Sequence, residues 1–217
     1  MAQPSEKRIL DKVCKSVETY DSVLMEKSLK EAFDAGIPPG EIMASGLGKG
    51  METVGKKFDA GRIFLPQVMA ASAVVNLAME KLSPFLDSDD KKYRGTVVMG
   101  SVQGDIHEIG KNVCCAMLRG AGYKVIDLGS DVSPYSFIEA AKSNSADIIA
   151  GSALMTTTLQ MQKAMVKAAD EEKYSVLMIF GGAPCTKEWV KSIGGDGYSS
   201  SGAEIVKLVD SLLENAQ

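Results

Sequence analysis

Residues 95–110 read GTVVMGSVQGDIHEIG, a β-branched apolar run that ends in small residues and opens into a polar loop. Three further apolar runs follow it along the chain, at 123–129 (YKVIDLG), 146–152 (ADIIAGS) and 174–182 (YSVLMIFGG). Continuous short apolar runs are typical of parallel strands that are covered by helices on both faces. The chain after residue 90 is therefore expected to form an α/β domain.

Helical patterns separate these runs, at 108–122, 134–144 and 158–173. A short fifth strand is expected around Gly197, and 202–216 forms a final helix. Alternating strands and helices of this length predict a doubly wound (Rossmann/flavodoxin-like) five-stranded parallel sheet. Ligands of such sheets bind beyond the carboxyl ends of the strands, near the point where the strand order reverses.

The first 86 residues contain no convincing strand. Apolar residues recur there at helical spacing, which predicts four helices, near 9–17, 21–36, 38–61 and 66–82. Asp21 is the expected N-cap of the second helix. Four helices with short connections imply a small bundle. The stretch 83–95 (SPFLDSDDKKYRG) reads as a linker, so we expect a helical cap domain over 1–89 and an α/β domain over 90–217.

Composition narrows the classes of function. The chain has 217 residues, 45% of them hydrophobic, and a net charge of −4. This charge favours neither nucleic acid nor an anionic membrane surface as a partner. No apolar run reaches membrane-span length and the N-terminus does not resemble a signal peptide, so a cytoplasmic protein is expected. The four cysteines form no CxxC pair, which argues against a zinc knuckle or a thioredoxin-type motif.

Three loops that follow predicted strands carry the residues of chemical interest. The pattern is Asp105-x-His107-x-x-Gly110, then 41 residues, Ser152-x-Leu154, then 26 residues, Gly181-Gly182. Because the carboxyl ends of parallel strands meet at one edge of the sheet, these loops are expected to converge there.

His107 is the only histidine of the chain. A neutral imidazole is a good nitrogen donor to a transition metal. Asp105, in the same loop, is placed to accept a hydrogen bond from the other ring nitrogen, which would fix the tautomer. A plainer interpretation exists for each motif: Asp105 as the N-cap of the next helix, Ser152 as a cap, and the glycine pair as turn residues.

The combined pattern resembles the cobalamin-binding signature of corrinoid proteins of the methylamine and methanol methyltransferase class, which are related to the cobalamin-binding region of methionine synthase. The resemblance implies cobalamin or a related corrinoid as cofactor. It makes His107 the lower axial ligand of cobalt, in place of the cofactor's own benzimidazole, with Asp105 behind it. The expected cofactor-binding residues are Gly104, Asp105, Ile106, His107, Ile109, Gly110, Ser152, Leu154, Thr156, Gly181 and Gly182.

The helical half contributes a second resemblance. Residues 50–72 (GMETVGKKFDAGRIFLPQVMAAS) are similar to the cap that covers the upper face of the corrin in this family. By position, Phe58 and Leu65 correspond to the two apolar residues that press on that face. The alternative is that both belong to the ordinary core of the bundle. Substrate access would require the cap to move, and 84–93 is the expected hinge.

The implied function is that of a methyl carrier without catalytic residues of its own. A substrate-specific methyltransferase would deliver a methyl group, preferably from a methylated amine, to Co(I). A second methyltransferase would pass it from methyl-Co(III) to a thiol or tetrahydrofolate, and a reductive activase would restore Co(I). The alternatives are a methanol or methoxyaromatic carrier, a cobalamin-dependent sensor or regulator, the small subunit of a cobalamin mutase, and a cofactor-free receiver domain.

Overall fold

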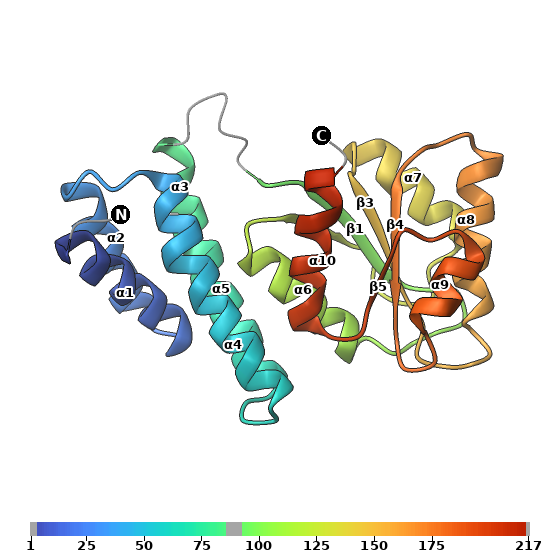
Figure 1. The fold of residues 1–217 in the computed structure, drawn as a ribbon, viewed down its shortest axis with the longest axis horizontal. Helices are drawn as coiled ribbons and strands as arrows, with labels where there is room; N and C mark the ends of the chain where they lie inside the picture. The colour runs from blue at the N-terminus through green and yellow to red at the C-terminus, as the bar shows by residue number, and fades with distance from the viewer. Residues whose placement is uncertain (1–3, 86–92, 216–217) are drawn as a thin grey trace. The chain divides into compact units, whose positions relative to one another are not determined.

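The computed structural model describes residues 4–85 and 93–215, which form two compact units (Figure 1). One unit comprises described residues of 1–94 and 116–122, and the other those of 95–115 and 123–217. The expected boundary between residues 89 and 90 lies outside the described residues, as does most of the expected hinge. The division into 1–89 and 90–217 therefore stays a prediction.

The first unit is helical. Its elements are α1 (Pro4–Glu18), α2 (Ser22–Asp34), α3 (Pro39–Glu41), the π-helix η1 (Ile42–Gly48), α4 (Lys49–Asp59), α5 (Leu65–Leu82) and the short 3₁₀ helix η2 (Ser83–Phe85). Asp21 caps α2 as expected, because its carboxylate accepts a hydrogen bond from the backbone N–H of Leu24 at 2.9 Å. The described helices confirm the predicted helical N-terminal half.

The third predicted helix differs from expectation, because seven residues of it are wound as a π-helix. Gly46, Gly48 and Gly50 lie in or beside this segment, and glycine weakens the preference for regular α-helix. Two of them are needed for close packing: a Cβ on Gly46 or on Gly50 would lie 2.7 Å from a side-chain carbon of Val13 or Val17, respectively. The glycines therefore allow this segment to approach α1 closely.

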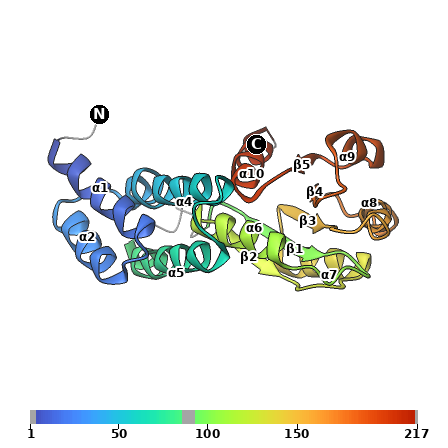
Figure 2. The same ribbon diagram turned by 90° about the horizontal axis from the view of Figure 1, so that it is seen from below.

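The second unit is a five-stranded parallel sheet in the order β2-β1-β3-β4-β5. The strands are β1 (Thr96–Ser101), β2 (Lys124–Asp127), β3 (Ile148–Ser152), β4 (Leu177–Gly181) and β5 (Gly197–Ser199). The helices are α6 (Ile109–Gly120), α7 (Pro134–Asn144), α8 (Gln160–Glu171), α9 (Lys187–Ile193) and α10 (Gly202–Asn215). Helices α7, α8 and α9 cover one face of the sheet, and α6 and α10 cover the other (Figures 1 and 2). This arrangement confirms the predicted doubly wound sheet.

Helix α9 had no counterpart among the predicted elements. It has only seven residues, and Thr186 caps it by accepting a hydrogen bond from the backbone N–H of Trp189 at 3.1 Å. Two of its side chains, Val190 and Ile193, are buried in the core of the sheet. Such a short helix with two core residues leaves too little periodicity to be recognised in sequence.

The strand register aligns the three motif loops. Ser101 pairs with Ser152, Ser152 pairs with Gly181, and Gly181 pairs with Ser199. The ends of β1, β3 and β4 therefore lie level at one edge of the sheet, where the predicted site residues begin.

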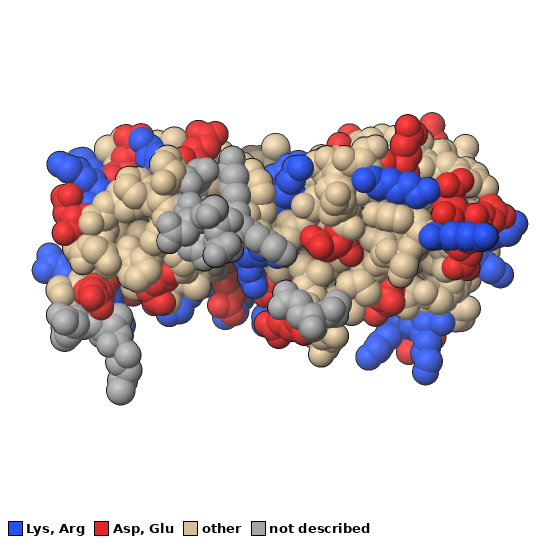
Figure 3. Space-filling view, turned by 90° about the horizontal axis from the view of Figure 1, so that it is seen from above, with Lys and Arg blue, Asp and Glu red and all other residues tan. Residues whose placement is uncertain are grey.

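Two surface properties complete the description. None of the helices in the described part of the chain is long and apolar enough to cross a membrane. Acidic and basic side chains are intermixed on the face shown in Figure 3.

Candidate functional site

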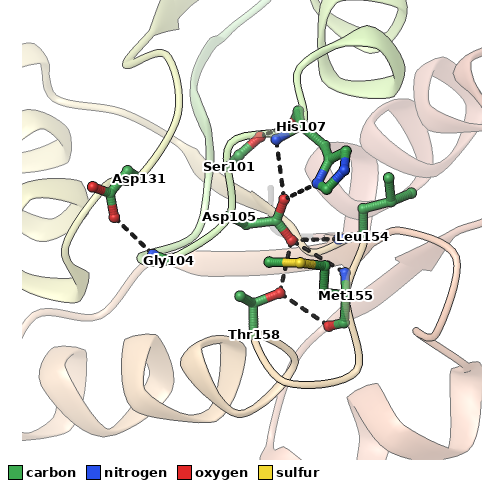
Figure 4. A network of polar contacts seen from close by, with 8 residues as sticks. All are labelled: Ser101, Gly104, Asp105, His107, Asp131, Leu154, Met155 and Thr158. Atoms are coloured by element: carbon green, nitrogen blue, oxygen red, sulfur yellow. Dashed lines mark hydrogen bonds and ion pairs between the residues drawn. The ribbon is translucent and has the colours of Figure 1, made fainter.

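The loop between β1 and α6 folds back against the end of its own strand (Figure 4). Ser101, the last residue of β1, is fully buried, and its hydroxyl donates a hydrogen bond to the backbone carbonyl of His107 at 2.6 Å. The backbone N–H of Asp105 donates to the carbonyl of Val102 at 2.9 Å. These bonds hold Asp105 inside the loop and His107 on its outer side.

The carboxylate of Asp105 is fully buried and accepts hydrogen bonds from two loops. Its Oδ1 accepts from the Nδ1 of His107 at 2.8 Å and from the backbone N–H of the same residue at 3.1 Å. Its Oδ2 accepts from the loop after β3: from the backbone N–H groups of Leu154 at 2.7 Å and Met155 at 3.2 Å, and from the hydroxyl of Thr158 at 2.7 Å. The expected hydrogen bond between Asp105 and His107 is confirmed.

These five donors decide the charge of Asp105. Burial by itself raises the pKa of the carboxyl group, but the hydrogen bonds from Thr158, His107 and Leu154 outweigh it, so the pKa falls well below its ordinary range. An ionised carboxylate only accepts hydrogen bonds, so the proton of the neutral imidazole is assigned to Nδ1. The Nε2 lone pair of His107, whose side chain is 46% exposed, is left available to a ligand.

Three apolar side chains of the two loops that meet at Asp105 are exposed. Ile106 is 74% exposed, Ile109 is 70% exposed, and Leu154, which lies beside the ring in Figure 4, is 46% exposed. A Cβ added to Gly110 would meet no other atom within 4 Å, so space adjoins the first turn of α6. Exposed apolar side chains in the same loops as an available nitrogen donor suit a ligand that combines apolar surface with a metal.

Comparison with known proteins agrees with this chemistry. A family model described as a B12 binding domain matches residues 95–207, and a second B12 binding domain model matches residues 9–83. The chain belongs to the B12-binding corrinoid protein family. The family's cofactor is cobalamin or a related corrinoid.

Relatives and solved structures cover nearly the whole chain. The chain is 39% identical to trimethylamine corrinoid protein 1 of Methanosarcina acetivorans, over 96% of this chain and 99% of the relative. It is 40% identical to dimethylamine corrinoid protein 3 of the same organism, over 90% and 95%. Its fold is similar to that of the methanol:cobalamin methyltransferase complex MtaBC of Methanosarcina barkeri, with a TM-score of 0.78 and 29% identity, over 95% of this chain and 80% of that one.

The residues at the site fit the family's cofactor. This cofactor would bring a cobalt ion, for which a nitrogen donor is a suitable ligand. His107 offers a nitrogen donor held by a carboxylate, the arrangement found behind metal-bound histidines in general. The exposed Ile106 and Ile109 and the open space at Gly110 offer apolar surface beside that donor.

Two of the three plainer interpretations of the motif residues are wrong, those for Asp105 and Ser152. Asp105 lies four residues before the first residue of α6, and its carboxylate accepts from His107 and from the β3 loop. Ser152 does not cap α8, because that helix begins at Gln160 and the side chain at its N-cap position makes no hydrogen bond.

The other predicted residues lie at the same edge of the sheet. Ser152 is half-buried at the end of β3, and Thr156 is exposed in the turn that follows. Gly182 has a φ of +118°, and a Cβ there would lie 1.8 Å from the carbonyl oxygen of Ala153. The chain's own backbone therefore requires glycine at 182. The expectation that Gly181 and Gly182 bind the cofactor stays a prediction.

Sequence reasoning missed Thr158, a buried residue whose hydroxyl is one of the five donors to Asp105. Residues 156–158 are three consecutive threonines, and the pattern favoured Thr156. Nothing in the sequence distinguishes them, because the path of the turn decides which hydroxyl points inward. The pairing of Gly104 with Asp131, at 2.7 Å from the backbone N–H to Oδ1, was missed as well.

The two predicted cap residues belong to the helical unit. Phe58 lies in the last turn of α4 and Leu65 is the first residue of α5, and both are half-buried. Phe64, between them, is 67% exposed. Neither predicted residue is thus fully enclosed by the helical unit, and their role toward the cofactor stays a prediction.

Proposed function

We propose that this chain is a corrinoid methyl carrier in which His107 is the lower axial ligand of the cobalt. The observation that carries the proposal is the hydrogen bond from the Nδ1 of His107 to the buried carboxylate of Asp105, at 2.8 Å. It leaves Nε2 as a nitrogen donor on an exposed side chain. When bound, the corrinoid supplies the cobalt that carries a methyl group between a donor and an acceptor.

Asp105 has two tasks in this proposal. Its negative charge makes His107 a stronger donor, and its hydrogen bond fixes the orientation of the ring. It can do both because the backbone N–H groups of Leu154 and Met155 and the hydroxyl of Thr158 hold its second oxygen. Asp105 would therefore keep its negative charge behind His107 both with and without a bound metal.

The apolar residues exclude water in this proposal. Ile106, Ile109 and Leu154 present exposed apolar surface beside the ring, and that surface gains stability when a flat apolar ligand covers it. Gly104 and Gly110 carry no side chains, so the two ends of the loop leave space for the ligand. Ser152, Thr156, Gly181 and Gly182 belong to strand ends that adjoin the loop, and we assign them to the cofactor's nucleotide tail.

We assign Phe58 and Leu65 to the upper face of the corrin. Their half-buried side chains are the support for this assignment, since a residue that shields a reactive centre needs some surface outside its own bundle. The hinge proposed for cap movement, 84–93, lies mostly outside the described residues.

The proposed methyl donor is a methylated amine. Its support is the set of relatives named for trimethylamine, dimethylamine and monomethylamine, which are 35–40% identical to this chain over 90% of its length or more. A methanol donor is the second candidate, because the fold is similar to a methanol:cobalamin methyltransferase complex at 29% identity. The proposed partners are a substrate-specific methyltransferase, a second methyltransferase for a thiol or tetrahydrofolate, and a reductive activase. The cytoplasm stays the expected location.

The visible spectrum of the corrinoid-loaded protein tests the ligand. We expect wild type loaded with hydroxycobalamin to differ from free cofactor, and His107→Gly to lose that difference and regain it when imidazole is added. Gln103→Ala is the matched control, because Gln103 is an exposed residue of the same loop. A His107→Gly spectrum identical to wild type would rule out ligation by His107.

The donor is tested separately. Loaded, reduced protein is mixed with purified methyltransferases and either tri-, di- or monomethylamine or methanol, and methylation of the cobalt is followed by absorbance. Methylation with an amine and not with methanol supports the amine proposal. Methylation with methanol alone would overturn the donor and leave the carrier role in place.

A further inference from the structure

The loop after β2 supports the His107 loop, although it contains none of the motif residues. Asp131 makes two hydrogen bonds to the segment just before His107, and the one to Gly104 is drawn in Figure 4. Its Oδ1 accepts from the backbone N–H of Gly104 at 2.7 Å, and its own backbone N–H donates to the carbonyl of Asp105 at 3.0 Å. One residue thus fixes the main chain on both sides of the Gly104–Asp105 peptide.

The backbone of Asp131 is strained. Its φ is +56°, in the left-handed region that costs a residue with a side chain about 1 kcal/mol, although aspartate and asparagine tolerate it better than most. Strain of this kind persists where the surrounding contacts determine the conformation, and it is concentrated at functional sites. The two hydrogen bonds to the His107 loop hold this conformation together with the bond from the backbone N–H of Val132 to the carbonyl of Ser101 at 3.0 Å.

An ion pair between a buried lysine and a partly exposed aspartate joins the end of β2 to the other end of the segment. Lys111, in the first turn of α6, is only 2% exposed, and its Nζ lies 2.6 Å from Oδ1 of Asp127, the last residue of β2. The same Oδ1 accepts from the backbone N–H of Gly129 at 3.0 Å. A buried cation near a helix N-terminus is unfavourable both in desolvation and in its interaction with the helix dipole. The Nζ of Lys111 also donates to Oδ1 of Asn112 at 2.7 Å, so Asp127 and Asn112 together hold the buried ammonium group.

We propose that Asp131 and the Lys111–Asp127 pair are positioning residues for the metal ligand. They clamp the segment 104–111 at its two ends, and His107 lies between the clamps. This inference rests on the proposed function, because it assigns these residues to the orientation of the proposed cobalt ligand. Loss of a clamp frees the loop, so the imidazole no longer faces the Asp105 carboxylate in one orientation and binds the metal less well.

The tautomer of His107 in the cofactor-free protein provides the first test. Since the chain has one histidine, ¹⁵N NMR of labelled protein reports this ring alone. Spectra are recorded at about pH 8.5, where an ordinary histidine is neutral. Wild type is expected to show the Nδ1–H tautomer, and Asp131→Ala a mixture of the two tautomers. Asp131→Asn is the matched control, since it keeps an oxygen acceptor and tolerates the same φ, and is expected to match wild type.

The loaded protein provides the second test. Asp131→Ala is expected to bind hydroxycobalamin roughly tenfold more weakly and to show a smaller His-bound fraction in its visible spectrum, as is typical when a residue behind a metal ligand is lost. Lys111→Met is expected to change both readouts in the same direction. Fluorescence of Trp189, the only tryptophan, checks that the α/β unit of each variant is folded.

Asp131→Gly keeps the inference testable if the alanine variant does not fold. Glycine adopts the positive φ without strain and still lacks the acceptor for Gly104, so it is expected to behave as the alanine variant does. If a folded Asp131→Ala or Asp131→Gly variant keeps the wild-type tautomer of His107 and the wild-type affinity for hydroxycobalamin, the role of Asp131 is overturned. The same result for Lys111→Met would overturn the role of the ion pair. If His107→Gly changes the spectrum while these variants do not, only this inference fails and the proposed function stands.

Discussion

The hydroxyl of Thr158 offers a sharp measurement of how the site is held together. It donates to Oδ2 of Asp105 at 2.7 Å in a buried environment, and the same oxygen lies 2.9 Å from the carbonyl of Met155. Thr158→Val removes the hydroxyl and nearly preserves the shape of the side chain. A hydrogen bond to a charged group contributes about 1.5–3 kcal/mol, and four other donors remain on Asp105, so we expect a loss near the lower limit, about 1.5–2 kcal/mol.

The assay is thermal unfolding followed by the fluorescence of Trp189, which lies in the same α/β unit. A loss of this size corresponds to a fall in Tm of about 5 °C for a domain of this length. Thr157→Val is the matched control, because Thr157 is exposed in the same turn. Its effect is expected to stay within about 0.5 kcal/mol, as for most surface substitutions. Equal Tm values for the two valine variants would refute the assigned role of Thr158.

Three further predictions concern packing and reactivity. Gly50→Ala is expected to destabilise the helical unit by about 1 kcal/mol in far-UV circular dichroism melts, because the added Cβ would lie 2.7 Å from a side chain of α1. In the control Gly40→Ala the added Cβ meets no atom within 4 Å, so no destabilisation is expected. Equal melting curves for the two variants would contradict the packing argument. Burial raises the pKa of the Cys185 thiol from 9.0 to about 11, so alkylation at pH 8 is expected to be about a hundredfold slower in native protein than in urea, and equal rates would contradict its burial. Gln162→Leu leaves the indole N–H of Trp189 without its acceptor at 2.9 Å, so we expect a shifted fluorescence emission and a Tm lowered by several degrees; an unchanged emission would disprove that contact.

The sheet and the hydrogen bond between Asp105 and His107 were predictable because their signals are local. Each long strand is an apolar run that ends in small residues, and Asp105 and His107 lie in one loop, so the bond between them spans two positions. Ser152 and Gly181 could be placed at the same edge because parallel strands end together.

The missed features depend on contacts between distant parts of the chain. Thr158 is 53 residues from Asp105, and Asp131 is 27 residues from Gly104, so no local pattern marks either of them. The π-helix at 42–48 likewise lies where the chain packs closely on α1, at residues more than thirty positions away. Sequence periodicity detects which face is buried, but it does not specify the partner that a given side chain meets.

The five donors on Asp105 have a thermodynamic consequence. The loop after β3 and the imidazole of His107 share one carboxylate, so a ligand that displaces the backbone at Leu154 also changes the charge density available to the ring. In the proposed carrier, apolar contact at Leu154 and coordination by His107 would therefore be coupled, and their free energies would not add. A double-mutant cycle between Leu154→Ala and His107→Ala, measured as corrinoid affinity, would give that coupling free energy directly. A non-zero value would mean that Leu154, a residue that is not a metal ligand, changes the strength of ligation by His107.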